Sequence, residues 1–136
     1  MNQFKHRLPL QIRFNDVDPM GHINNAVSME FFDLGKSSFF AAAGIPVTPD
    51  ECEFTVMIVH YDVDFKGQMH AHDKLEVCTR LEKFGTKSIT LFQQIECNGM
   101  VAVECRTVLA GYDIKHGVSA ALPEEFKEKI LRYEAQ

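Results

Sequence analysis

A short segment of the chain collects residue types that carry out nucleophilic and acid–base chemistry. It runs from Asn15 to Asn25, reads N-D-V-D-P-M-G-H-I-N-N, and holds Asp16, Asp18 and His22. A carboxylate can attack an acyl carbon itself, or it can take a proton from an attacking water. Two carboxylates and one imidazole within a single turn therefore indicate a site for acyl-group or proton-transfer chemistry.

The same segment shapes the backbone and leads into a predicted helix. Pro19 and Gly21 favour a turn rather than a core position. Asn24 or Asn25 is a favourable N-cap for a helix. The free N–H groups and the positive dipole end at a helix start stabilise a developing oxyanion. A carboxylate just before such a helix can supply the nucleophile or base, while the backbone holds the carbonyl oxygen of an acyl group.

One long helix is predicted from Asn24 or Asn25 onward. Apolar residues recur there with helical spacing, and they are Val27, Phe31, Leu34, Phe39 and Phe40. Gly44 and then Pro46 provide a C-terminal stop. The phenylalanines, including Phe32, are interpreted as core that packs against a sheet.

The rest of the chain is predicted to be mainly strands. Alternating patterns predict strands over residues 8–14, 57–65, 75–82, 89–95 and 101–112. Asn98-Gly99 predicts a two-residue hairpin turn, and a short helix begins near Pro123. A sheet with one apolar face needs a cover, and the long helix is large enough to provide it. The sequence thus predicts an α+β fold with a curved antiparallel sheet around one central helix.

Length and composition limit the class of protein. The 136 residues fit one domain, and 46% hydrophobic with 24% charged residues is typical of a soluble globular protein. The net charge of -5 argues against a nucleic-acid partner. No apolar leader and no membrane span are visible, so a cytoplasmic location is expected. Four cysteines without a C-x-x-C pair are predicted to be reduced thiols.

The most specific pattern is the run R-F-N-D-V-D-P-M-G-H-I-N-N with the aromatic-rich helix after it. Its informative residues are Arg13, Asp16, Asp18, Gly21, His22, Asn24, Asn25 and then Glu30. Later stretches read D-x-L-x-V from Asp73 and G-T-K-S from Gly85. Together these patterns resemble the 4-hydroxybenzoyl-CoA thioesterase-like family of hotdog enzymes over nearly the whole chain. The resemblance implies a single hotdog domain, residues 1–136, that acts as an acyl-CoA thioesterase.

The resemblance also implies roles for individual residues. Asp18 is the implied catalytic carboxylate, as nucleophile or general base, and the backbone N–H of Asn25 points at the thioester oxygen. His22 is a further catalytic candidate, for which a structural role is equally expected. The nucleotide end of CoA is implied to bind at Gly85, Lys87 and Ser88.

The implied assembly is a homodimer or a homotetramer with its site between subunits. No cofactor and no metal are expected for the reaction. His70 and His72 are spaced so that both can point to one side of a strand, but the sequence places no third metal ligand. Asp16 is interpreted as a structural residue that bonds nearby backbone N–H groups.

Two other functions remain open. A hotdog hydratase or dehydratase would pair a histidine with a carboxylate, and Asp18 with His22 could form such a pair. A non-catalytic acyl-CoA-binding domain would use the same fold without a reaction. Asp18 favours hydrolysis, because a pure binder needs no carboxylate at the carbonyl. Ser28 stands where family members often carry an aromatic residue, so the resemblance sets no acyl-chain preference.

Overall fold

The computed structural model describes residues 4–46 and 53–136 of the chain. Its elements are β1 (His6–Leu10), a 3-10 turn η1 (Phe14–Asp16), α1 (Asn25–Ala42), β2 (Phe54–Phe65), β3 (Leu75–Phe84), β4 (Ser88–Cys97), β5 (Met100–Asp113), β6 (Val118–Ser119) and α2 (Glu124–Ala135). None of the described helices is long and apolar enough to span a membrane.

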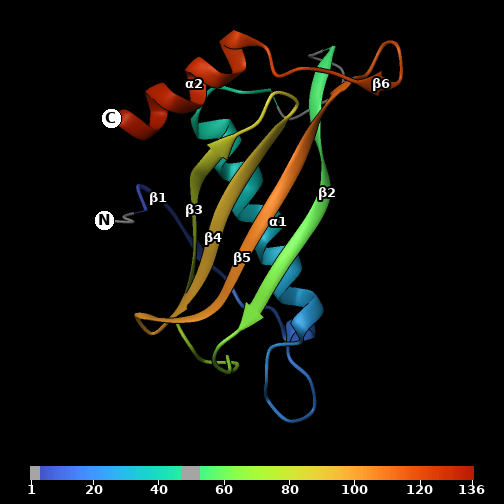
Figure 1. The fold of residues 1–136 in the computed structure, drawn as a ribbon. Helices are drawn as coiled ribbons and strands as arrows, with labels where there is room; N and C mark the ends of the chain where they lie inside the picture. The colour runs from blue at the N-terminus through green and yellow to red at the C-terminus, as the bar shows by residue number, and fades with distance from the viewer. Residues whose placement is uncertain (1–3, 47–52) are drawn as a thin grey trace.

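One curved sheet contains all of these strands. The order is β1-β3-β4-β5-β2, every pairing is antiparallel, and β6 pairs with the end of β5. Helix α1 lies along the inside of the curve (Figure 1). A curved antiparallel sheet around one long helix, with a short C-terminal helix, confirms the predicted hotdog fold. The strands β1 and β2 form the two edges of the sheet.

Three local predictions explain the boundaries of the elements. The side-chain oxygen of Asn24 accepts a hydrogen bond from the N–H of Ala26 at 2.8 Å, so Asn24 caps α1. Gly44 ends the helix with a φ of 83°, a conformation that favours glycine. Asn98 and Gly99 have φ of 53° and 84° between β4 and β5. Positive φ at both positions is typical of a two-residue hairpin turn, which confirms that prediction.

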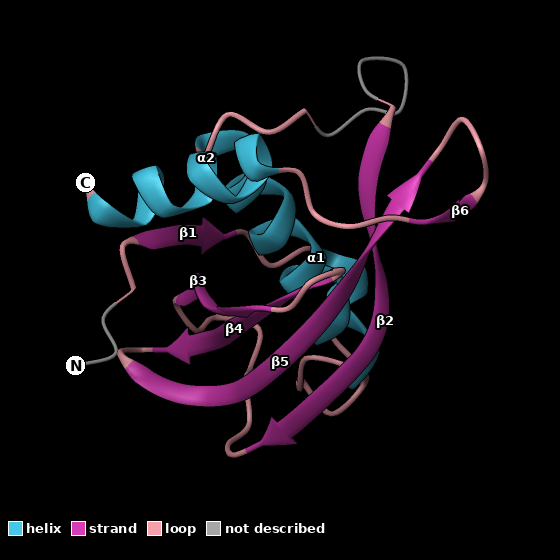
Figure 2. Cartoon of the chain, turned by 45° about the horizontal axis from the view of Figure 1, so that its top comes forward, coloured by secondary structure: helices cyan, strands magenta, loops and turns pink. Residues whose placement is uncertain are grey.

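The phenylalanines of α1 fill the core between helix and sheet, as predicted. The buried ones are Phe31, Phe32, Phe39 and Phe40. They pack against inward-facing residues of the strands, among them Val77, Ile95 and Leu109. Helix α2 closes the core at the C-terminal end of α1 through Phe126 and Ile130 (Figure 2).

Gly35 allows α1 to lie very close to β3 and β4. A Cβ atom at this position would lie 2.8 Å from Cγ2 of Val77 and 3.1 Å from Nε2 of Gln93. The buried amide of Gln93 donates hydrogen bonds to the carbonyl of Phe32 at 3.0 Å and to Oγ1 of Thr79 at 2.9 Å. Contact and hydrogen bonds together fix the height of the helix above the sheet, and they thereby position its N-terminus.

The first strand is shorter than predicted. It ends at Leu10, whereas the alternating pattern predicted a strand through Phe14, which instead lies in η1 and is 93% exposed. The chain turns there because the carboxylate of Asp16 accepts a hydrogen bond from the backbone N–H of Arg13 at 2.8 Å. The two-residue strand β6 was not predicted.

The cysteines of the described chain are not paired with one another. Cys78, Cys97 and Cys105 are free thiols, which confirms the prediction for these three. Cys52 lies outside the described residues.

Candidate functional site

The segment with the candidate catalytic residues folds as a small hairpin ahead of α1. The N–H of Asp18 donates to the carbonyl of His22 at 2.9 Å, and the N–H of Gly21 donates to the carbonyl of Asp18 at 2.9 Å. Pro19 and the positive φ of Gly21, 82°, suit such a short turn. The hairpin therefore places Asp18 and His22 directly before the helix start.

The backbone orients the carboxylate of Asp18. Its Oδ1 accepts hydrogen bonds from the N–H of Met20 at 2.9 Å and from the N–H of His22 at 3.0 Å. Within the described chain, both of its hydrogen bonds fall on Oδ1, which leaves Oδ2 available for chemistry. His22 contributes its backbone N–H and not its ring, so this geometry does not form the histidine–carboxylate pair of a hydratase.

The start of α1 supplies a hydrogen-bond donor. Oδ1 of Asn24 accepts from Ala26, and the carbonyl of Asn24 accepts from the N–H groups of Val27 and Ser28 at 2.9 and 3.3 Å. The N–H of Asn25 has no acceptor among residues 4–46 and 53–136. It is therefore a donor at the positive end of the helix dipole, where an anionic oxygen is stabilised.

These groups share one cavity. Asp18, His22 and Asn25 line a cavity of about 530 Å³, within the range of small-molecule sites. Its facing wall is formed by residues that the sequence analysis did not identify, namely Phe65, Lys66, Gly67, Gln68 and Met69. The one sequence signal for this wall is the break in the alternating pattern at Lys66-Gly67. The structure thus brings the predicted catalytic residues together and adds the end of β2.

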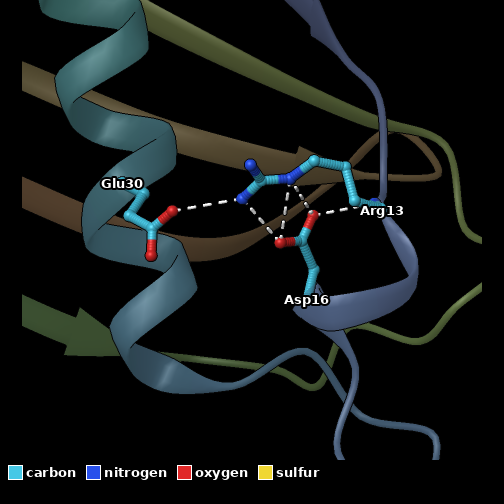
Figure 3. Close-up of polar contacts among 3 residues, drawn as sticks. All are labelled: Arg13, Asp16 and Glu30. Carbon is cyan, nitrogen blue, oxygen red and sulfur yellow. Dashed lines mark hydrogen bonds and ion pairs between the residues drawn. The ribbon is translucent and has the colours of Figure 1, made fainter.

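A second carboxylate holds the hairpin against α1. Asp16 is 1% exposed and accepts a hydrogen bond from the guanidinium of Arg13 at 2.8 Å. The same guanidinium donates to Glu30 of α1 at 3.1 Å (Figure 3). The hydrogen bonds from Arg13 hold the pKa of Asp16 below its usual range. Asp16 therefore has the contacts of a structural residue, and it connects the hairpin to the helix that carries Asn25.

The predicted CoA-binding residues lie elsewhere in the chain. Gly85 and Lys87 lie in the β3–β4 connection, and Ser88 begins β4. The N–H of Gly85 closes this turn by donating to the carbonyl of Ser88 at 2.7 Å. This connection lies at the opposite end of the sheet from the loop that precedes α1 (Figure 1). A strand as long as β3, 10 residues, spans about 33 Å. Within one chain, the structure does not bring these residues to the catalytic cavity.

One group of possible metal ligands lies on the outer face of the sheet. Ligand atoms of Glu76, Cys78 and Glu96 lie within 4.8 Å of one another. Nη1 of Arg7, however, lies 2.8 Å from Glu76 and 3.0 Å from Glu96. Burial raises the pKa of the Cys78 thiol to about 12. The guanidinium already pairs with both carboxylates, so the cluster is explained as an ion-pair network.

His70 contacts a histidine from another segment of the chain. The ring of His70 lies against the ring of His22, with 4.8 Å between their centroids. Sequence spacing gave no indication of this contact, because the two residues belong to separate segments.

A family model and a solved structure both relate this chain to thioesterases. Residues 12–130 match the model of the thioesterase-like superfamily. A thioesterase from Thermus thermophilus, solved in complex with coenzyme A and Zn, is 29% identical, with a TM-score of 0.86 over 100% of this chain and 98% of that one. No curated protein matches the chain.

Two further solved structures establish the likeness of fold. One is described as a predicted thioesterase from Bacillus stearothermophilus, 24% identical, with a TM-score of 0.83 over 93% of this chain and 94% of that one. The other is a Staphylococcus aureus protein in complex with CoA, 17% identical, with a TM-score of 0.87 over 98% and 85% of the two chains.

Proposed function

Because the chain belongs to the thioesterase-like superfamily, we propose that it is an acyl-CoA thioesterase, which hydrolyses an acyl-CoA to the free acid and CoA. One observation carries this proposal: the carboxylate of Asp18 and the helix-start residue Asn25 line the same cavity. Thioester hydrolysis requires a nucleophile or base at the carbonyl carbon and a donor at the carbonyl oxygen. Coenzyme A in the Thermus relative supports CoA as the thiol.

The proposed reaction uses these two groups. The N–H of Asn25 donates a hydrogen bond to the carbonyl oxygen as it becomes negative, and one such donor is commonly worth about 10²–10³ in kcat. Oδ2 of Asp18 attacks the carbonyl carbon, or it takes a proton from a water that attacks there. In both routes the C–S bond breaks, CoA leaves as the thiolate, and water supplies the new oxygen of the free acid. No step requires a metal or cofactor.

The free edge of β2 favours a homodimer. This strand has 12 residues and pairs with β5 alone among the described strands. Met57, Val59 and Phe65 are 50%, 62% and 49% exposed along it. A long edge strand with exposed apolar side chains is a template for pairing with a second chain. We therefore place the dimer contact at β2.

A dimer of this kind would also complete the site. Antiparallel pairing of β2 with its copy about a twofold axis sets the start of one strand beside the end of the other. The cavity at Phe65 and Lys66 would then face the opposite end of the partner's sheet. Lys87 of the partner subunit and Ser88 of the partner subunit would lie on that side and hold the nucleotide of CoA. This arrangement accounts for the distance between the two predicted parts of the site within one chain.

The outer face of the sheet favours a dimer over a tetramer formed through that face. It carries ion pairs, among them Arg7 with Glu76 at 2.8 Å and Arg106 with Glu82 at 2.9 Å. Burying such pairs between subunits costs desolvation that their attraction only partly repays. We therefore propose the homodimer as the functional unit and keep the homotetramer as the second possibility.

The proposal is tested by thiol release, followed with a thiol-reactive dye, from short, long and aromatic acyl-CoAs. Sedimentation velocity on the same sample gives the mass of the assembly. We expect turnover of at least one substrate and the mass of a dimer. A folded dimer that binds a non-hydrolysable acyl-CoA analogue but releases no thiol from any substrate would replace this function with acyl-CoA binding.

A further inference from the structure

His22 and His70 face each other where the catalytic hairpin meets the segment after β2. Their backbones form an isolated antiparallel bridge. Two hydrogen bonds flank this bridge, from the N–H of Ile23 at 2.8 Å and from the N–H of Ala71 at 3.2 Å, each to a carbonyl of the facing segment. Because the bonds lie on either side of the pair, the two histidines occupy a non-hydrogen-bonded position, where cross-strand side chains come closest.

The two rings have the spacing of ligands that share one ion. Their centroids lie 4.8 Å apart, and their planes are inclined by 74°. Two imidazoles on one tetrahedral zinc ion, with N–Zn distances of about 2.0–2.1 Å, have ring centroids about 5 Å apart. Within the described ranges, neither ring nitrogen of His22 engages in a hydrogen bond, and neither does Nε2 of His70. These nitrogens are therefore free to bind an ion after a small rotation of the side chains.

Asp73 contacts His70 in a way that favours metal binding by its ring. Its Oδ2 accepts a hydrogen bond from the backbone N–H of His70 at 2.7 Å and lies 3.4 Å from Nδ1 of the ring. Asn98 and Cys97 also donate to this carboxylate, at 3.0 and 3.2 Å, and hold it in place. A carboxylate at one imidazole nitrogen orients the ring and makes the other nitrogen a better metal ligand. The side chain of His70 is 51% exposed, so an ion can reach it.

From this geometry we propose that His22 and His70 form a binding site for one divalent transition-metal ion of the zinc class. Imidazole nitrogen selects zinc, nickel, copper and cobalt over magnesium and calcium. Water completes the coordination, so the site is open and binds an ion less tightly than a structural zinc site with four protein ligands. The proposed hydrolysis requires no ion, so binding of the ion can be measured independently of activity.

The test is calorimetric titration of the metal-free, full-length protein with zinc chloride, using His22→Gln and His70→Gln as ligand variants. His72→Gln is the matched control, because His72 is an exposed histidine two residues from His70 and lies outside the bridge. We expect one ion per chain. Each ligand variant should weaken binding at least tenfold, and the control should bind within about twofold of the native chain. Circular dichroism verifies that each variant is folded.

Three results would overturn the proposal. The first is the absence of saturable zinc binding by the folded native protein. The second is a loss of affinity in His72→Gln with none in His22→Gln, which would assign binding to the neighbouring pair in sequence. The third is full affinity in both ligand variants, which would place the ion elsewhere, such as at Glu76 and Glu96.

Discussion

Replacing Gly35 with alanine tests how closely α1 lies against the sheet. The new Cβ would lie 2.8 and 3.0 Å from the two methyl carbons of Val77, a side chain with 0% exposure. Overpacking of this kind costs about 1–3 kcal/mol. Alanine in place of glycine within a helix returns about 1 kcal/mol. We therefore expect Gly35→Ala to lower the free energy of unfolding by about 1 kcal/mol.

A second variant separates the cost of overpacking against Val77 from the gain in helix propensity. In a Val77→Ala background the two contacts with the Val77 methyl carbons are removed, and the closest remaining contact of the new methyl is Nε2 of Gln93 at 3.1 Å. There, Gly35→Ala should stabilise the protein by up to about 1 kcal/mol, a reversal of sign that indicates coupling of about 2 kcal/mol. Urea denaturation of the four proteins measures this cycle. Stabilisation by Gly35→Ala in the native background would refute the close approach of α1 to β3.

Three further predictions concern stability and assembly. Burial holds the pKa of His6 in the folded protein below 6.5, its ordinary value. The unfolded chain therefore binds a proton at His6 more readily than the folded protein, so the stability that neutral His6 contributes is present above pH 6.5 and is lost as the pH falls toward the folded-state pKa. His6→Gln should therefore flatten the decline in unfolding free energy between about pH 7 and pH 5, and an unchanged slope contradicts this. The hydroxyl of Ser28 is buried without a partner in the described chain, so Ser28→Ala should raise the melting temperature; a lower one would reveal a hydrogen bond. Val59→Asp places a charge on the free edge of β2 and should convert the dimer to monomer in sedimentation velocity, whereas an intact dimer would move the interface elsewhere.

The elements were predictable where one residue type determines the local backbone. Asn24 and Gly44 define the ends of α1, and Asn98-Gly99 defines the turn between β4 and β5. The first strand was predicted too long because alternation continues through Ile12 and Phe14. A hydrogen bond within three residues, from Arg13 to Asp16, outweighs that pattern.

The sequence predicted only those residues of the site that lie close together along the chain. Asp18 and Asn25 are close in sequence, so one hairpin and one helix start place both. The wall formed by Lys66 and its neighbours depends on how β2 pairs with β5, which local patterns do not specify. The contact of His22 with His70 could not be predicted for the same reason, because it depends on an isolated β-bridge between two segments that are distant in sequence.

The most direct test of the account is the steady-state rate of thiol release by Asp18→Asn on the best acyl-CoA of the native chain. Asparagine keeps an oxygen that can accept from Met20 and His22, so the hairpin should persist while the carboxylate is lost. Glu128→Gln, which also turns an exposed carboxylate into an amide but lies on α2, outside both the cavity lining and the edge of β2, is the control. We predict that kcat falls by about 10²-fold or more in Asp18→Asn and is unchanged in the control. A folded Asp18→Asn protein that retains the native rate would contradict the assignment of Asp18 as the catalytic carboxylate.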